Sequence, residues 1–452
     1  MTERSLSYAM RNVPRYTSYP TAPHFNAGVD GKTYAEWLSK LASTDSLSLY
    51  LHVPFCRELC HYCGCHTKAT RQDAPLQEYA RTLLKELELV GDHLQSPGPV
   101  RHIHWGGGTP SLLPEQSLID ITGMLRVIFD FAPDLEHAIE LDPRYVSKSL
   151  VKTLASMGVN RASLGIQDLD EAVQQAIGRV QPYSVVKTAV SYLRSVGLTD
   201  LNFDLMYGLP RQTLQTIRET VARTVELRPR RIALFGYAHV PWMKKHQRLI
   251  PEHQLPGSSE RMELAAAARE DLLTAGYQAI GLDHFALPED SMAIASSNGS
   301  LRRNFQGYTT DQGEQLIGFG VSSIGKLSQG YVQNMSDVGH WRRAIDAGQL
   351  PVAKGMALST DDLLRGRIIE VLMTDYECDL AQVAAAFGTD PADLSGSIGR
   401  LGELADDGLV TVDGWKVSMT EKGLPFVRLA AAAFDAYLEG NSTGEKRHSL
   451  AV

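Results

Sequence analysis

Short apolar runs alternate with amphipathic segments between about residues 46 and 240. The runs are rich in β-branched and aromatic residues, and the segments between them place apolar residues three and four positions apart, as one face of a helix requires. This alternation is typical of a parallel sheet whose strands are joined by crossover helices. The predicted strands are 47–53, 100–105, 138–141, 161–166, 201–205 and 231–237, and the predicted helices are 76–94, 115–129, 148–157, 185–196 and 214–227. Six strands fall short of the eight of a closed TIM barrel, so we predict an α/β fold with a partial (β/α)6 barrel.

Polar and glycine residues sit where the predicted strands end. A cysteine-rich loop follows the first strand, and three consecutive glycines follow the second. The ends of the other four strands carry Glu140 with Asp142, Gln167, Asp204, and Ala238 with His239. In barrels the carboxyl ends of the strands form the rim that carries active sites, because the loops there converge on one mouth. We therefore predict an active site at this rim.

The C-terminal region has a different pattern. From about 355 to 438 it turns helical, and a helix at 401–413 leads into a short hairpin at 415–419, an order that resembles a winged helix. Residues 360–440 hold fifteen Asp and Glu against six Lys and Arg, the opposite of the balance that contacts with phosphates need. We expect a lid or a structural module here rather than a DNA-binding domain.

Four regions are expected along the chain. Within residues 1–45, the segment 14–21 contains two prolines and has no clear period, and we expect an extended N-terminal arm packed on the main body. Residues 46–350 hold the barrel and a C-terminal elaboration, with an alanine-rich helix near 263–273 and a seventh strand at 278–282. The mostly helical, winged-helix-like domain follows, and residues 440–452 are expected to form a flexible tail.

The composition is that of a soluble globular protein, with 43% hydrophobic and 21% charged residues. A formal net charge of -8 argues against non-specific binding to nucleic acid or to an anionic membrane. The first residues lack the apolar segment of a signal peptide, and no run of about 18 apolar residues occurs. We expect a cytoplasmic protein with no nucleic-acid or membrane partner. Nothing predicts a coiled coil or a dimerisation helix, so we expect a monomer.

Four of the five cysteines fall within ten residues, as Cys56, Cys60, Cys63 and Cys65. Three plain explanations are a disulfide pair, a structural zinc site and thiols that merely pack. Disulfide frameworks suit small secreted domains, and zinc sites usually use two well-separated ligand pairs. An iron–sulfur cluster fits better, because a short loop supplies its thiolates. If only the first three bind a four-iron cluster, one iron stays open to a small molecule. Cys65 is then a fourth ligand in a resting state, a neighbouring thiol or a feature of one subfamily.

This loop, CxxxCxYCxC, resembles that of radical S-adenosylmethionine (radical SAM) enzymes, in which the open iron chelates the amino and carboxylate groups of SAM. In that superfamily a glycine-rich segment after the second strand meets the SAM amino group, and Gly107, Gly108 and Thr109 match it. Consecutive glycines also let a ligand approach the backbone closely. The resemblance implies a [4Fe-4S] cluster and SAM as cofactors.

A wider set of motifs resembles the oxygen-independent coproporphyrinogen III oxidase (dehydrogenase) family. The set comprises PRYTSYPTA, YLHVPFC, CxxxCxYCxC, HWGGGTP, YAHVP, DHFA and NFQGYTT, with Gln167, Arg179 and Asp204. It spans the chain from about residue 10 to 438. The resemblance implies a radical SAM oxidoreductase of porphyrin and haem biosynthesis.

The resemblance also implies the roles of single residues. Cys56, Cys60 and Cys63 would hold the cluster, and two SAM molecules would bind beside it. The first SAM would lie against Tyr50, Tyr62, Gly107, Glu140 and Ile324, and the second near Gly108, Thr109, Gln167, Arg179, Asp204 and Ala238. Tyr62 stands where many relatives have Phe. Phe305 and Gln306 would lie near the substrate or the second SAM.

The implied reaction removes two carboxylates from coproporphyrinogen III. A low-potential electron cleaves SAM to methionine and a 5′-deoxyadenosyl radical, which takes hydrogen from a propionate; loss of CO2 and an electron leaves a vinyl group. Two such steps give protoporphyrinogen IX, and no protein side chain is assigned a catalytic role. The electron donor and the terminal acceptor are unidentified. Four propionates call for cations, and the candidates are Arg15, Lys244 and Arg303.

Three alternatives remain. A haem chaperone of the same branch shares the barrel, but such relatives typically have an aromatic residue in place of Cys65 and lack the PRYTSYPTA arm. This chain has both the cysteine and the arm, as the oxidases do. A radical SAM methyltransferase or a haem-degrading relative would use the same fold. An acidic winged-helix regulator with a redox cluster is disfavoured by the charge balance and by the complete set at the rim.

Overall fold

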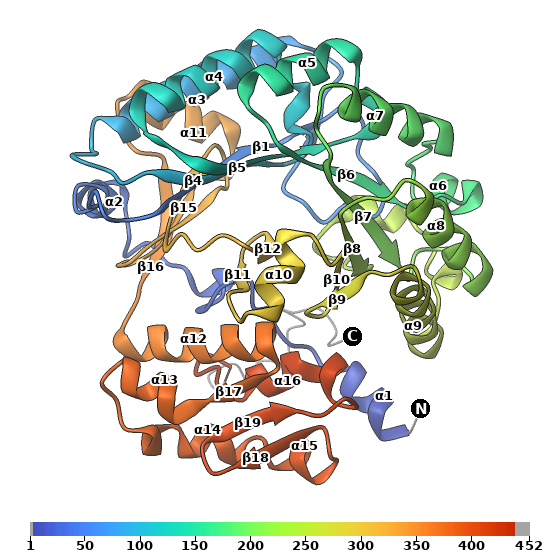
Figure 1. Ribbon diagram of the computed structural model, residues 1–452. Coiled ribbons are helices and arrows are strands. Elements are labelled where there is room, and N and C mark those ends of the chain that lie inside the picture. Colours follow the sequence, from blue (N-terminus) through green and yellow to red (C-terminus); the bar gives the residue numbers. More distant parts are fainter. Residues whose placement is uncertain (1–2, 439–452) are drawn as a thin grey trace. The chain divides into compact units, whose positions relative to one another are not determined.

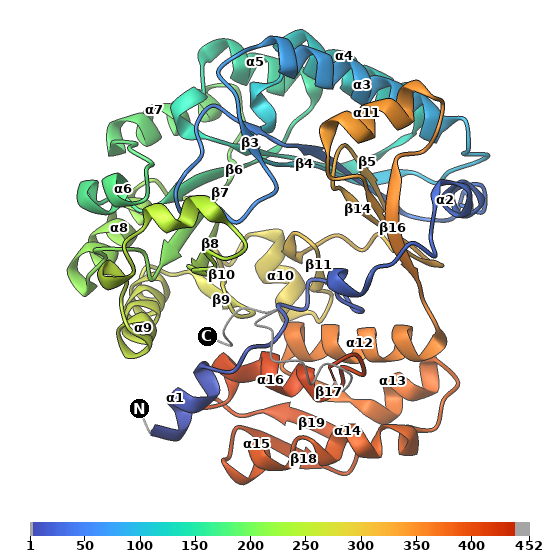
Figure 2. The same ribbon diagram turned by 180° about the vertical axis from the view of Figure 1, so that it is seen from behind.

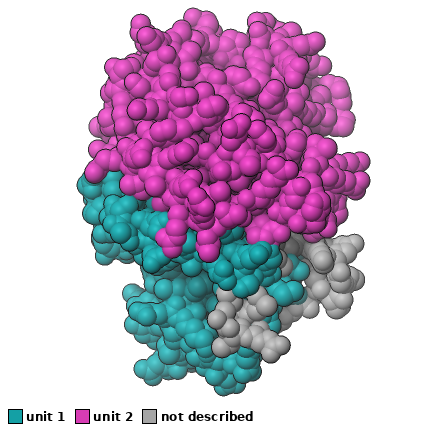
Figure 3. Space-filling model, turned by 90° about the vertical axis from the view of Figure 1, so that its right-hand side faces the viewer, with its two compact units in different colours: residues 1–25, 257–310, 358–452 teal, residues 26–256, 311–357 magenta. Residues whose placement is uncertain are grey.

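The computed structural model describes residues 3–438 (Figures 1 and 2). The chain forms two compact units, which Figure 3 shows in different colours. Among the described residues, one unit holds 26–256 and 311–357, and the other holds 3–25, 257–310 and 358–438. The four regional boundaries expected from the sequence stay predictions, and the expected tail at 440–452 lies outside the described residues.

The larger unit is built on one sheet with strand order β16-β15-β14-β13-β1-β4-β5-β6-β7-β8. Its six predicted strands are all present and pair in parallel with their neighbours. They are β1 (Leu47–Val53), β4 (Val100–Gly107), β5 (Phe131–Leu141), β6 (Arg161–Gln167), β7 (Asp200–Tyr207) and β8 (Arg231–Gly236). The prediction of a partial barrel is confirmed.

Helices cover the outer face of these strands (Figures 1 and 2). They are α3 (Ala74–Gly91), α4 (Glu115–Ile128), α5 (Lys148–Met157), α6 (Glu171–Ala176), α7 (Tyr183–Ser195) and α8 (Leu214–Glu226). Each of the longer ones turns an apolar face to the sheet; in α3, for example, Leu76, Leu83 and Leu87 are fully buried. Such faces follow from apolar residues at helical spacing, which is why the sequence predicts these helices closely.

Four further strands extend the sheet beyond β1. They are β13 (Gln315–Phe319), β14 (Ile324–Leu327), β15 (Gly330–Asn334) and β16 (Val352–Ala357), and α11 (Val338–Asp346) joins the last two. β13 pairs in parallel with β1, whereas β14, β15 and β16 pair antiparallel. The sequence does not predict them as strands, because they are short and interrupted by glycines.

The N-terminal segment is less extended than the sequence predicts. Residues Glu3–Ala9 form helix α1 and residues Gly31–Leu38 form helix α2. Asp30 caps α2, because its side chain accepts a hydrogen bond from the backbone N–H of Thr33. The expectation of an arm that is extended throughout 1–45 is therefore wrong for these two helices.

The smaller unit is mostly helical. Besides α1 it contains α9 (Ser258–Thr274), β9 (Gln278–Ile280), β10 (His284–Ala286), α10 (Ser291–Ser297), β11 (Arg302–Asn304), β12 (Gly307–Thr309), α12 (Thr360–Asp375), β17 (Glu377–Asp379), α13 (Leu380–Ala386), α14 (Ser395–Gly399), α15 (Gly402–Asp406), β18 (Val410–Asp413), β19 (Lys416–Met419) and α16 (Val427–Ala432). Strands β17, β19 and β18 form a small antiparallel sheet.

One predicted helix of this unit is shorter than expected. The helix expected at 401–413 ends at Asp406, and Val410–Asp413 is the first strand of the hairpin. Gly408 has a φ of 67°, which ends the helix, and the β-branched residues that follow favour a strand. In residues 3–438 no helix is both long enough and apolar enough to cross a membrane.

Candidate active site

The cysteine loop follows strand β1 and is closed by two short parallel strands, β2 (Phe55–Cys56) and β3 (Lys68–Ala69). The backbone N–H of Lys68 donates to the carbonyl of Pro54 at 2.7 Å. Cys60 is buried, Cys56 and Cys63 are half-buried, and Cys65 is exposed. Three of these residues are thus at least half-buried, and the thiol of Cys65, the exposed one, is in hydrogen-bond contact with that of Cys63.

Polar groups surround the buried and half-buried thiols. The Sγ atom of Cys56 lies 3.3 Å from the hydroxyl of Thr67 and 3.6 Å from that of Thr109. Burial raises the pKa of Cys56, and these two hydroxyls oppose that rise. Nη1 of Arg179 donates to the Sγ atom of Cys60 over 3.6 Å. Hydrogen-bond donors and a guanidinium stabilise thiolates, which is the form that binds iron.

A second segment fixes the backbone of the loop. The Nζ atom of Lys244 donates to the carbonyl of Cys65 at 2.9 Å, and Nε2 of His246 lies 2.7 Å from the carbonyl of Cys63. Nε2 of the buried Gln247 donates to the carbonyl of Tyr62 at 2.9 Å and to that of Ala238 at 3.3 Å. The sequence singles out neither His246 nor Gln247. Ala238 and Tyr62, both predicted site residues, are thus held by one side chain.

Three predicted residues of the first SAM site, Tyr50, Gly107 and Glu140, lie on the neighbouring strands β1, β4 and β5. The backbone N–H of Gly107 donates to Oε2 of Glu140 at 3.1 Å. Gly107 has a φ of 113°, and a Cβ atom there would lie 2.7 Å from the ring of His52. Only glycine fits this position, because any side chain would collide with that ring.

Tyr50 and His52, both on β1, lie against the glycines at the end of β4. The hydroxyl of Tyr50 lies 3.0 Å from Nδ1 of His52, whose Nε2 lies 3.1 Å from the carbonyl of His66. Burial lowers the pKa of His52, so the ring is neutral, with Nδ1 accepting from the tyrosine. His52 is missed by the sequence analysis, although its spacing of two from Tyr50 places both side chains on the same face of the strand.

Ile324 reaches the same edge of the sheet through strand pairing. Tyr50 on β1 pairs with Gly318 on β13. A Cβ atom at Gly318 would lie 3.0 Å from the carbonyl group of Ile324, the first residue of β14. The absence of a side chain at Gly318 therefore lets Ile324 come close to the strand position opposite Tyr50.

Three predicted residues of the second SAM site, Gln167, Arg179 and Asp204, lie beside Gly165. Nη2 of Arg179 donates to the carbonyl of Gly165 at 2.7 Å, and its Nη1 lies 3.2 Å from the carboxylate of Asp142. A Cβ atom at Gly165 would lie 2.8 Å from Nε2 of Gln167. Burial alone would raise the pKa of Asp142, but Arg179 and Arg144 hold it below its usual range. The carboxylate is therefore ionised and anchors Arg179.

Asp204 is oriented by its neighbours on β6 and β7. Its carboxylate accepts from the hydroxyl of Ser163 at 3.0 Å and from the amide of Asn202 at 2.9 Å. Gln167, at the end of β6, has a φ of 67°, an unfavourable conformation for a non-glycine residue that functional sites often contain.

The residues present fit the implied cofactors. Three thiols from one short loop match the ligand chemistry of an iron–sulfur cluster. A glycine cradle beside an acceptor carboxylate matches an ammonium group, since charge-assisted hydrogen bonds are strong. The fit rests on Cys56, Cys60, Cys63, Gly107 and Glu140.

Four substrate candidates lie in the smaller unit. Nη2 of Arg303 donates to the carbonyl of Arg15 at 3.1 Å, and its guanidinium stacks on the ring of Tyr308 at 4.4 Å from the centroid. Phe305 and Gln306 belong to the turn between β11 and β12. Their roles stay predictions, as does that of Lys244.

Comparisons with known proteins agree with this site. The family model described as the radical SAM superfamily matches residues 50–224, and that described as the HemN C-terminal domain matches residues 358–426. Both matches fall on regions described above, the first on the barrel and the second on the C-terminal part of the smaller unit.

Several relatives match along almost their whole length. A protein described as oxygen-independent coproporphyrinogen III oxidase from Bradyrhizobium diazoefficiens is 47% identical over 448 residues, 99% of each chain. One described as coproporphyrinogen III oxidase, anaerobic 1, from Cereibacter sphaeroides is 43% identical over 99% of this chain and 98% of its own. The solved structure of coproporphyrinogen III oxidase (HemN) from Escherichia coli, described as a radical SAM enzyme, superimposes with a TM-score of 0.90 at 35% identity, covering 94% of this chain and 97% of that one.

Proposed function

The chain belongs to the oxygen-independent coproporphyrinogen III oxidase family of radical SAM enzymes, and we propose how the rim of its barrel performs the reaction of that family. It is a radical SAM oxidoreductase that converts coproporphyrinogen III to protoporphyrinogen IX in haem biosynthesis without oxygen. The observation that carries the mechanism is the meeting of the cysteine loop, Gly107, Glu140 and Arg179 at the ends of neighbouring strands.

When bound, the [4Fe-4S] cluster and SAM supply a 5′-deoxyadenosyl radical that takes a hydrogen atom from the substrate. Cys56, Cys60 and Cys63 hold the cluster, and the donors around Cys56 and Cys60 favour their thiolates. Cys65, an exposed residue, is left outside the ligand set.

The rim residues orient SAM. Glu140 and the Gly107 cradle receive the amino group of the first SAM, while Tyr50, Tyr62 and Ile324 pack against it. A second SAM would lie near Gly108, Thr109, Gln167, Arg179, Asp204 and Ala238, of which Gln167, Arg179 and Asp204 lie beside Gly165. The hydrogen bonds that fix Glu140, Arg179 and Asp204 restrict the reacting atoms to one geometry.

The substrate brings four carboxylates, which need cations. Arg15, Arg303 and Lys244 serve that purpose, and Phe305 and Gln306 lie against the substrate or the second SAM. At each of two propionates the chain positions the β-carbon for loss of one hydrogen atom; the remaining radical gives up CO2 and one electron to leave a vinyl group. Guanidinium groups suit this task because they pair with carboxylates through two hydrogen bonds.

The partners follow from the electron balance. One low-potential electron enters for each SAM that is cleaved, and one electron leaves for each carboxylate that is lost. The enzyme therefore needs a low-potential donor and a terminal acceptor, both unidentified. We infer that it acts as a cytoplasmic monomer, without nucleic acid or membrane as a partner.

Removal of one cluster ligand tests this function. Cys60→Ala leaves two of the three thiolates, so it is expected to abolish iron binding and SAM cleavage in anaerobically reconstituted protein. Cys378→Ala is the matched control, because Cys378 is a buried cysteine of the smaller unit and should keep both. Full iron content and SAM cleavage in Cys60→Ala would overturn the assignment.

A further inference from the structure

Glu86 is a buried carboxylate that no step above uses. It lies on α3 with 1% of its surface exposed. Its Oε2 atom accepts from the backbone N–H of Gly320 at 2.7 Å, and its Oε1 atom accepts from the amide of Asn334 at 2.5 Å. The same amide nitrogen also donates to the carbonyl of Gly320 at 3.0 Å. Glu86 and Asn334 thus bind both the backbone N–H and the carbonyl of Gly320.

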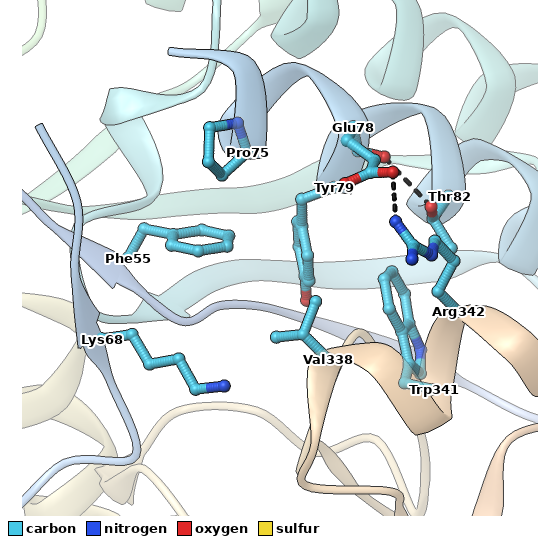
Figure 4. A pocket seen from close by; sticks show the side chains of 9 residues that line it. All are labelled: Phe55, Lys68, Pro75, Glu78, Tyr79, Thr82, Val338, Trp341 and Arg342. Atoms are coloured by element: carbon cyan, nitrogen blue, oxygen red, sulfur yellow. Dashed lines mark hydrogen bonds and ion pairs between the residues drawn. The ribbon is translucent and has the colours of Figure 1, made fainter. Parts of the chain in front are cut away.

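Tyr79 reinforces this contact from two helical turns earlier on α3. Its hydroxyl accepts from the backbone N–H of Val321 at 3.1 Å and donates to the carbonyl of His52 at 2.6 Å. Figure 4 shows its ring between Phe55 and Trp341 in a pocket of about 200 Å³. The ring stacks on Trp341 with 4.7 Å between centroids and meets Phe55 edge-on at 5.3 Å. The hydroxyl is therefore fixed in place.

The segment that these side chains hold is the turn at 320–323, between β13 and β14. Gly320 has a φ of 87° and Ser322 a φ of 57°, so the turn contains a non-glycine residue in the left-handed region. Such a conformation persists only where the surroundings enforce it. A Cβ atom at Gly320 would lie 2.4 Å from both the carbonyl of His52 and the hydroxyl of Tyr79. The turn is thus packed tightly against the end of β1.

This turn leads directly to Ile324, the first residue of β14. Its conformation therefore sets where Ile324 stands at the rim. We propose that Glu86 is a positioning residue for SAM: with Tyr79 and Asn334 it fixes the 320–323 turn and thereby the place of Ile324. The inference rests on the proposed contact between Ile324 and the first SAM.

A purely supporting role for Glu86 explains the contacts less well. A buried carboxylate is costly, and an apolar side chain of similar size would pack α3 at lower cost. Burial raises the pKa of Glu86 to about 7, which is a measure of that cost. Both of its oxygens accept hydrogen bonds from residues outside α3, Gly320 and Asn334, and Gly320 belongs to the turn. The carboxylate thus serves the turn rather than the helix.

The proposal predicts a split between binding and turnover. If the turn is loosened, only a fraction of the molecules present Ile324 correctly, and the apparent dissociation constant of SAM rises by the inverse of that fraction. Saturating SAM recovers the correct conformation, so kcat is little changed. A change in the chemistry of the site would instead lower kcat.

The test uses the full chain, anaerobically reconstituted, with two variants and one control. Glu86→Gln keeps the size of the side chain but turns an amide N–H2 toward a donor, and Tyr79→Phe keeps the ring stacking but removes the bridging hydroxyl. Thr82→Val is the matched control, since Thr82 is buried on the same helix and its hydroxyl donates to the carbonyl of Glu78 within that helix. The readouts are hydrogen–deuterium exchange of the amides of Gly320 and Val321, the SAM dissociation constant, and kcat at saturating SAM.

Glu86→Gln is expected to speed exchange at Gly320 and Val321 and to weaken SAM binding about tenfold, which corresponds to roughly 1.4 kcal/mol, with kcat within about twofold of wild type. Tyr79→Phe should act in the same direction and keeps the test valid if Glu86→Gln does not fold. Unchanged exchange, or faster exchange with unchanged SAM binding, would overturn the proposal. Hydrogen–deuterium exchange is also measured before reconstitution. If the wild-type chain protects the turn but binds no SAM, the proposed function itself is wrong. The inference about Glu86, which rests on it, is then wrong too.

Discussion

Nη1 of Arg179 donates to the Sγ atom of Cys60 over 3.6 Å, although 119 positions separate the two residues. The same nitrogen lies 3.2 Å from the carboxylate of Asp142. Burial would lower the pKa of Arg179, but Tyr62, Asp142 and Cys60 raise it instead. Arg179 is therefore a permanent cation that connects the cysteine loop to the group of residues proposed to hold the second SAM.

Replacing Arg179 by lysine tests this connection. Lysine keeps the charge, but a single ammonium cannot reach Cys60, Asp142 and the carbonyl of Gly165 as the guanidinium fork does. We expect Arg179→Lys to weaken SAM binding at least about tenfold, or roughly 1.4 kcal/mol, with iron content unchanged because all three thiols remain. Equilibrium binding and iron analysis provide the measurement. The control is Arg144→Lys, since Arg144 also pairs with Asp142, whereas the hydrogen bond to Cys60 comes from Arg179; equal harm from both variants would assign the effect to Asp142 alone.

Cys65→Ala is expected to keep the cluster. Cys65 is an exposed residue, and the loop uses its backbone carbonyl, which accepts from Lys244 and which alanine retains. Iron per chain and the visible absorption of the cluster should therefore match those of the wild type. A loss of iron equal to that in Cys60→Ala would make Cys65 a ligand.

The rim of the barrel could be predicted from the sequence because its residues follow from strand positions. Once β1 to β8 are recognised by their apolar runs, the carboxyl ends of parallel strands must meet, and Glu140 and Gly107 are brought together without further information. The contact between them spans only neighbouring strands.

The residues and elements that lie outside the rim could not be predicted in this way. Glu86 looks like an ordinary acidic residue of an amphipathic helix, and its partner Asn334 lies 248 positions away. Strands β13 to β16 are short and glycine-rich, so they carry no period that marks them. Helix α2 was missed although Asp30, its cap, is a recognisable signal.

Gly107→Ala is expected to disrupt the SAM cradle. Alanine at a φ of 113° is strained, and its Cβ atom would collide with the ring of His52; such substitutions cost more than about 1 kcal/mol. We expect SAM binding to be lost or to weaken at least about tenfold in equilibrium binding. Gly123→Ala is the matched control, because this exposed glycine inside α4 has open space around it and should stabilise the protein by about 0.5–1 kcal/mol. Normal SAM binding in Gly107→Ala would contradict the assignment of the cradle.

Glu86 also predicts a dependence of stability on pH. Burial raises its pKa from 4.5 to about 7. Below pH 4.5 the carboxyl is protonated in both the folded and the unfolded chain, and between pH 4.5 and 7 only the unfolded chain loses the proton. The folded state therefore loses stability as pH rises through this window, by roughly 3 kcal/mol in all. Tyr34 and Tyr79 face Glu86, and burial raises the pKa of each further above its ordinary value, so neither titrates in this range.

Urea unfolding of wild type and Glu86→Gln across this pH range shows whether the free energy of unfolding falls as pH rises. The stability of the wild type relative to Glu86→Gln should fall between pH 4.5 and 7 and then level off. Thr82→Val should run parallel to the wild type at all pH values. A difference between wild type and Glu86→Gln that stays constant with pH would mean that Glu86 is ionised in the folded state throughout.

The central claim is the decarboxylation itself, and an anaerobic assay tests it most directly. Reconstituted protein is incubated with SAM, a low-potential reductant, an electron acceptor and coproporphyrinogen III, and protoporphyrinogen IX and 5′-deoxyadenosine are followed together. The predicted result is formation of both products, with two carboxylates lost from each substrate molecule. Cleavage of SAM without decarboxylation would contradict the account and would point to a haem-related protein of the same branch with another task.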